Sequence, residues 1–88
     1  MEIQSEEQFQ ELRNQITVWK KRFSMFRHDV DNIERIIETH ITNYSIAMVF
    51  YRQTRKKKYL EDAQQEIDSI NRVLSTVEKL ELMALLGQ

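Results

Sequence analysis

Apolar side chains recur at alternating spacings of three and four residues from Phe9 to Tyr51, and no proline or glycine interrupts them. Heptads sustained beyond about three repeats are typical of helices that pack in a coiled coil or a bundle. The pattern predicts an all-α fold with one long helix from about Ser5 to Arg55. The members of this first series are Phe9, Leu12, Ile16, Trp19, Phe23, Phe26, Val30, Ile33, Ile37, His40, Tyr44, Ala47 and Tyr51.

The start of this helix carries its own signal. Ser5 is followed three residues later by Gln8, which matches a capping box, and Glu6 and Glu7 suit the positive end of a helix dipole. His40 is the one member of the series that is neither apolar nor aromatic. A single polar residue in a seam often fixes register, so we favour that role for His40 over a catalytic one, and ordinary packing in the seam is the simpler expectation.

A second series follows in a different register, and it predicts a second helix over about 59–86, with Gly87 placed to cap it. The two registers meet in a basic junction over 52–59. We expect a turn or kink there, between two antiparallel helices; a discontinuity within one continuous helix is the alternative. The members of the second series are Leu60, Ala63, Ile67, Ile70, Leu74, Val77 and Ala84.

Residues 36–51 leave the number of helices open, and whether the first helix breaks near 24–28 or near 39–45 is also open. They are rich in β-branched and aromatic side chains, and several small polar residues among them could begin a new helix. We expect residues 1–88 to form a single unit, an elongated helical hairpin or coiled coil of two long helices, with a compact three-helix bundle as the alternative. Apolar residues outside the series make this segment apolar around much of its circumference: Ile36, Ile41, Met48, Val49 and Phe50.

Composition argues against the common enzyme classes. The chain has one glycine and no cysteine, so glycine-rich phosphate loops, nucleophile elbows and zinc–thiolate sites have no residues to form them. His28 and His40 are too far apart on a helix to share a ligand, and no Glu-x-x-His motif accompanies the carboxylate pairs. We expect a protein that is not an enzyme and that binds neither a cofactor nor a metal.

The net charge of −1 hides a local concentration of cations. The cluster interleaves with Tyr51 and Tyr59, a pattern found at nucleic-acid and acidic-lipid sites. A solvated turn, or pairing with the acidic last helix, is the alternative to such a site. The possible contacts with an anionic partner are Arg52, Arg55, Lys56, Lys57 and Lys58.

Location and membrane contact follow from the same composition. No apolar run approaches the ~20 residues of a membrane-spanning helix, and the first residues are acidic and polar, unlike a signal peptide. We expect a cytoplasmic protein that makes weak contact with a membrane surface at most, and for which nucleic acid is an unlikely partner.

Residues 60–77 resemble the terminal helix of KxDL-motif proteins. Asp68-Ser-Ile-x-Arg72 matches that family, whereas the position of its Lys-x-Asp-Leu tetrapeptide reads Gln64-Gln-Glu-Ile67. Arg27 and Asn32 extend the resemblance over residues 27–77. The resemblance implies a non-enzymatic subunit of the elongated helical complexes that act in endosome and lysosome biogenesis and positioning.

The leading hypothesis is a structural subunit that packs its apolar seam against partner helices in a multi-subunit complex. A hetero-oligomer is favoured and a homo-oligomer is possible. A small nucleic-acid-binding or regulatory protein that uses residues 52–58 is the alternative. The predicted partner contacts are Trp19, Phe23, Phe26, Ile33, Ile37, Tyr44, Ile67, Ile70, Leu74, Val77, Leu82 and Leu85.

Overall fold

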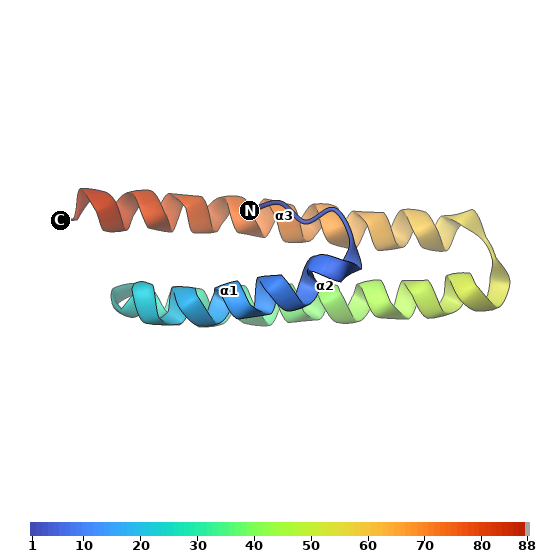
Figure 1. Cartoon of the computed structure of the whole chain (residues 1–88). Coiled ribbons are helices and arrows are strands. Elements are labelled where there is room, and N and C mark those ends of the chain that lie inside the picture. The colour runs from blue at the N-terminus through green and yellow to red at the C-terminus, as the bar shows by residue number, and fades with distance from the viewer. Residues whose placement is uncertain (88) are drawn as a thin grey trace.

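The computed structural model describes residues 1–87 and is all-α, as predicted. Two 3-10 turns, η1 (Glu6–Gln8) and η2 (Ser24–Phe26), precede the helices that they introduce. The helices are α1 (Phe9–Arg22), α2 (Arg27–Thr54) and α3 (Lys57–Leu86). The molecule is a rod with extents of 52 × 18 × 17 Å (Figure 1).

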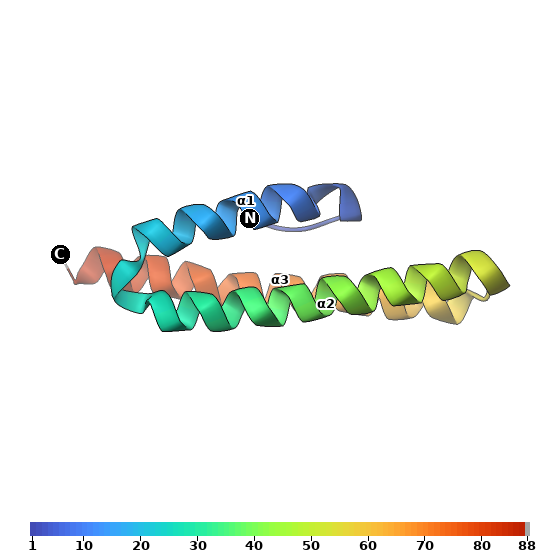
Figure 2. The same cartoon turned by 90° about the horizontal axis from the view of Figure 1, so that it is seen from below.

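The long helices α2 and α3 form an antiparallel hairpin, and α1 folds back along one end of it (Figure 2). At 1.5 Å per residue α1 is about half as long as either partner. The rod therefore contains three packed helices along the part that α1 covers and only two near the α2–α3 turn. The predicted elongated hairpin is confirmed. A third, shorter helix is added to it, but it arises from a break at residues 23–26 and not from the segment 36–51 on which the three-helix alternative is based.

The continuous helix predicted over about 5–55 is wrong, because the chain turns at Phe23 and Phe26. The backbone angles φ and ψ are −107° and 48° at Phe23 and −110° and 30° at Phe26, and Ser24–Phe26 form η2. No proline or glycine causes this break. The reversal instead brings α1 against the hairpin and buries Phe23, so tertiary packing overrides local helix preference. No second break occurs at residues 39–45, where the hydroxyls of Thr39 and Ser45 donate to carbonyls within α2.

The basic junction is a tight turn, which confirms the loop interpretation over the discontinuity. α2 ends at Thr54 and α3 begins at Lys57. Arg55 adopts a left-handed conformation with φ 58°, and its N–H donates to Tyr51 O at 2.7 Å. The Thr54 hydroxyl accepts from Lys56 N–H at 3.2 Å and donates to Phe50 O at 2.8 Å.

The N-terminal segment is held by α3. Ile3 is buried, and its backbone N–H and C=O both bond to the Asn71 side chain. The predicted role of Gln8 is confirmed, because its side-chain carbonyl accepts from the N–H groups of Gln4 and Ser5 at 2.7 and 3.4 Å. The polypeptide thus doubles back before α1, so that residue 3 lies beside α3 (Figure 1).

The core is a single apolar layer between the three helices. Phe9 meets Tyr44 edge to face, with ring centroids 5.2 Å apart, which ties the start of α1 to α2. Burial raises the pKa of the Tyr44 phenol. The buried residues are Ile3, Phe9, Leu12, Ile16, Trp19, Phe23, Val30, Ile33, Ile37, Ile41, Tyr44, Ala47, Ala63, Ile67, Ile70, Leu74, Val77 and Leu80.

Candidate interaction surfaces

Most of the residues predicted to contact a partner lie instead in the core of the chain itself. Phe26 is partly buried against that core. In the folded chain the buried side chains among the predicted contacts are not available to a partner. This finding corrects the sequence-based prediction. The physical reason is that α1 folds back and α3 pairs with α2, so the seam is satisfied within one chain. The residues concerned are Trp19, Phe23, Ile33, Ile37, Tyr44, Ile67, Ile70, Leu74 and Val77.

The remaining two predicted contacts, Leu82 and Leu85, are exposed on the last turns of α3. These turns extend past the reversal between α1 and α2 (Figure 1). With Met25 on that reversal, which is 88% exposed, they belong to an apolar end patch: Met25, Leu82, Met83, Leu85 and Leu86. A hollow of about 340 Å³ adjoins the patch, between η2 and the end of α3.

A second apolar surface lies on the side of α2 that faces away from the core. Ile46, Val49 and Phe50 are 49%, 47% and 45% exposed and form what we call the outer ridge. Their spacing places them on one helix face. This surface is partly visible in the sequence, because Val49 and Phe50 are apolar residues outside the heptad series.

The outer ridge is flanked by two hollows. The first, of about 500 Å³, is lined by Arg13, Ile41, Thr42, Ser45, Ile46, Val49 and Phe50. The second, of about 360 Å³, lies towards α3 and is lined by Asn43, Ile46, Ala47, Phe50, Tyr59, Asp62, Gln65 and Glu66. In ridges-into-grooves packing, the side-chain ridges of one helix fit into the grooves of another. A ridge with a groove on each side therefore has the surface shape that can receive a neighbouring helix.

The five cations of the junction lie at the turn between α2 and α3 and are all exposed; we call them the basic tip: Arg52, Arg55, Lys56, Lys57 and Lys58. Two of them rest on aromatic rings. The Arg55 guanidinium lies 5.5 Å from the centre of the Tyr51 ring, and Lys58 Nζ lies 4.9 Å from that of Tyr59. Within residues 1–87 none of the five forms an ion pair. Pairing with the acidic last helix, one of the expected alternatives, is therefore not found there.

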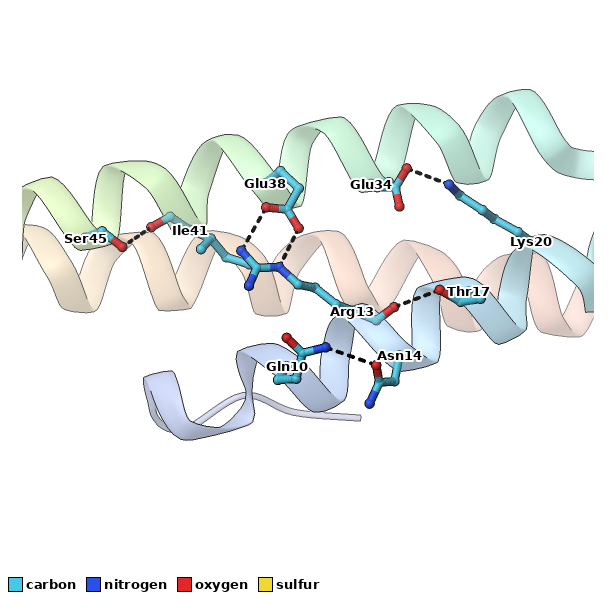
Figure 3. Close-up of polar contacts among 9 residues, drawn as sticks. All are labelled: Gln10, Arg13, Asn14, Thr17, Lys20, Glu34, Glu38, Ile41 and Ser45. Atoms are coloured by element: carbon cyan, nitrogen blue, oxygen red, sulfur yellow. Dashed lines mark hydrogen bonds and ion pairs between the residues drawn. The ribbon is translucent and has the colours of Figure 1, made fainter.

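Charged side chains fasten α1 to α2 (Figure 3). Arg13 Nε and Nη2 donate to the two carboxylate oxygens of Glu38 at 2.8 and 3.1 Å. Lys20 Nζ lies 2.7 Å from Glu34 Oε1. The hydrogen bonds from Arg13 hold the pKa of Glu38 below its ordinary value. These carboxylates therefore act as structural ties between helices.

His40 joins α2 to α3, because its Nδ1 lies 2.5 Å from Glu66 Oε2 in a partly buried pair. His28 is exposed in the first turn of α2 and does not approach His40. In the described part of the chain no three His, Asp or Glu side chains gather in a way that could hold a metal ion. None of the helices spanning residues 9–86 has the length and apolarity needed to cross a membrane.

Comparisons with models of protein families, with curated proteins and with solved structures found no match. The surfaces themselves are therefore the basis for inferring function.

Proposed function

We propose that this chain is a non-enzymatic structural subunit that binds helices of other proteins in a multi-subunit helical assembly. The observation that carries the proposal is the outer ridge. Its three side chains remain half exposed although the chain has already satisfied its heptad seam. A helix that is apolar on both its inner and outer faces is typical of a helix enclosed by neighbours on both sides.

The shape of the surface around the outer ridge supports a helix as the partner. Covering the exposed parts of Ile46, Val49 and Phe50 would contribute about 25 cal/mol for each Å² of apolar surface removed from water. The hollows on either side would receive side chains of the partner, so the contact area would extend beyond the ridge. Aromatic anchors such as Phe50 are enriched among the residues that dominate binding energy.

The end patch supports an assembly with more than one partner. It lies at the other end of the rod from the outer ridge (Figure 1). One partner helix cannot cover both surfaces unless it runs the length of the molecule. Because the two surfaces differ in shape and composition, a hetero-oligomer is the favoured form.

The cellular setting of this proposal rests on the resemblance to KxDL-motif proteins alone. Residues 60–77, which carry that resemblance, lie within α3. On this ground we propose that the assembly acts in endosome and lysosome positioning. Co-purification of the chain with other subunits of such a complex tests this setting separately from the binding surface.

The decisive experiment substitutes the outer ridge and measures assembly. Ile46→Asp with Val49→Asp should remove co-purifying subunits while circular dichroism remains helical, because both side chains lie outside the core. Thr39→Asp, on an exposed and polar part of α2, is the matched control. Unchanged co-purification of the doubly substituted chain would reject the outer ridge as the binding surface.

A nucleic-acid-binding role remains the second candidate, supported by the five exposed cations of the basic tip. Binding through phosphates weakens steeply with salt. Titration of duplex DNA at several salt concentrations tests it, with Arg55, Lys56, Lys57 and Lys58 changed to Gln. Affinity that is independent of salt, or unchanged in the variant, would reject this candidate.

A further inference from the structure

The outer ridge on α2 adjoins the basic tip, because the Phe50 ring stacks on Tyr59, and Lys58 Nζ lies 4.9 Å from the centre of the Tyr59 ring. Arg52 lies in the last turn of α2, two residues after Phe50, and the other four cations lie in the turn and in the first residues of α3. We propose that the ridge and the tip together bind an amphipathic helix that places apolar side chains on the ridge and acidic side chains over the tip. This inference deepens the proposed function by specifying the chemistry of the partner.

The tip is electrostatically incomplete in the isolated chain. Five like charges lie within seven residues, and no carboxylate among residues 1–87 pairs with them. Two of these cations, Lys57 and Lys58, also occupy the first turn of α3, where the helix dipole disfavours positive charge. A partner carboxylate at this position relieves both repulsions at once.

The tip is also ordered before a partner arrives. The Arg55 and Lys58 head groups rest on the rings of Tyr51 and Tyr59, and Tyr59 stacks on Phe50 with centroids 5.4 Å apart. Tyr59 therefore connects Lys58 to Phe50 of the ridge, while Arg55 rests separately on Tyr51. Side chains held in this way lose less conformational entropy on binding.

An acidic helix fits this surface better than a nucleic acid or a membrane does. Asp62 and Glu66 line the hollow between the ridge and α3. A phosphate backbone or lipid headgroups that spanned both ridge and tip would meet these carboxylates. A helix can place its acidic residues over the tip alone and polar residues over Asp62 and Glu66.

The test uses two designed helical peptides that share one apolar stripe. One carries Glu in its last turn, placed to reach the tip, and the other carries Lys at the same positions. Titrating the full chain against each labelled peptide by fluorescence anisotropy should give at least ~10-fold tighter binding of the Glu peptide. The preference should shrink as salt rises.

Two variants separate the two parts of the surface. Changing Arg55, Lys56, Lys57 and Lys58 to Gln should abolish the preference for Glu, whereas changing Lys21, Arg27 and Lys79 to Gln, away from the tip, should preserve it. The double substitution Ile46→Asn with Val49→Asn should lower the affinity for both peptides by a similar factor. Equal affinity for both peptides, lost in the ridge variant, would overturn the acidic partner and leave the assembly function standing.

A second experiment tests whether anionic lipids or nucleic acid bind this surface in place of an acidic helix. The chain is mixed with vesicles of equal parts phosphatidylcholine and phosphatidylserine, and separately with a duplex DNA. Binding to either, together with no preference between the two peptides, would overturn the proposal. Tight binding of the Glu peptide that neither vesicles nor duplex displaces is the supporting result.

Discussion

Asn71 binds the backbone of Ile3 with both ends of its amide. Its Oδ1 accepts from Ile3 N–H at 2.7 Å, and its Nδ2 donates to Ile3 O at 2.8 Å. The Asn71 side chain therefore satisfies the hydrogen-bonding groups of the Ile3 backbone, as the backbone of a neighbouring strand would in a sheet. The contact closes a separation of 68 residues and holds the buried Ile3 side chain against the core.

Asn71→Ala should destabilise the fold by about 1–3 kcal/mol, because two backbone groups of Ile3 lose their partner. Urea unfolding followed by the fluorescence of Trp19, the single tryptophan, measures the free energy of unfolding. Asn43→Ala, an exposed asparagine on α2, is the control and should change it little. Equal losses from the two substitutions would show that the Ile3 contact adds no stability.

Arg55→Gly should be more stable than Arg55→Ala by about 1 kcal/mol. Both variants remove the contact with Tyr51, but only glycine adopts φ 58° without strain. Thermal unfolding of the two variants measures the cost of the left-handed backbone at position 55, because the guanidinium is absent from both. A more stable alanine variant would contradict the left-handed turn.

Ile70→Ala should cost about 2–5 kcal/mol, because this side chain is fully buried between the helices. Ile36→Ala removes the same atoms from a site that is 43% exposed and should cost far less. Chemical unfolding of both variants compares burial directly. Similar losses at the two sites would mean that the α2–α3 core is not packed as described.

Stability should fall in acid partly through Glu38. Its pKa is depressed by Arg13, so the ion pair contributes fully above the ordinary glutamate pKa of about 4.3 and is lost as pH falls through the lower folded-state value. Because the pair is exposed to solvent, its contribution is below about 1 kcal/mol. The difference in unfolding free energy between wild type and Glu38→Gln should vanish in strong acid. A difference that stays constant from neutral pH into strong acid would contradict a contribution from the Arg13–Glu38 pair.

A double-mutant cycle should detect coupling between His40 and Glu66 of about 0.5–1.5 kcal/mol. The two side chains are in direct contact between α2 and α3, and about a quarter of each is exposed. The cycle compares His40→Ala, Glu66→Ala and the double variant by urea unfolding. Additive effects would remove the basis for a register role of His40.

The helices and their inner faces could be predicted from sequence because heptad spacing and capping are local signals. Ser5 with Gln8, the change of register and the basic junction each marked an end that the structure confirms. The reversal at Phe23 had no such signal, since nothing in residues 23–26 disfavours helix. Periodicity identifies a buried face but does not say whether the same chain or another one buries it. Heptad spacing alone therefore does not distinguish a core position from a partner contact for Trp19 and Ile70.

The Ile3 contact could not have been predicted either. An isolated apolar residue before the first helix has no periodicity, and Asn71 reads as an ordinary polar position of a helix. The outer ridge was partly visible as apolar residues outside the series. Its exposure depends on the placement of α1, which lies along the other end of the hairpin and leaves the ridge uncovered.

The short connection between α2 and α3 has a consequence for the order of folding. A loop as tight as the one at Arg55 and Lys56 brings the two long helices together at minimal loop-closure entropy, so the hairpin should form first and rapidly. α1, which is about half as long as its partners, should dock onto the hairpin afterwards. The pairing of residue 3 with residue 71 closes the longest loop and should be the last step in folding and the first to open.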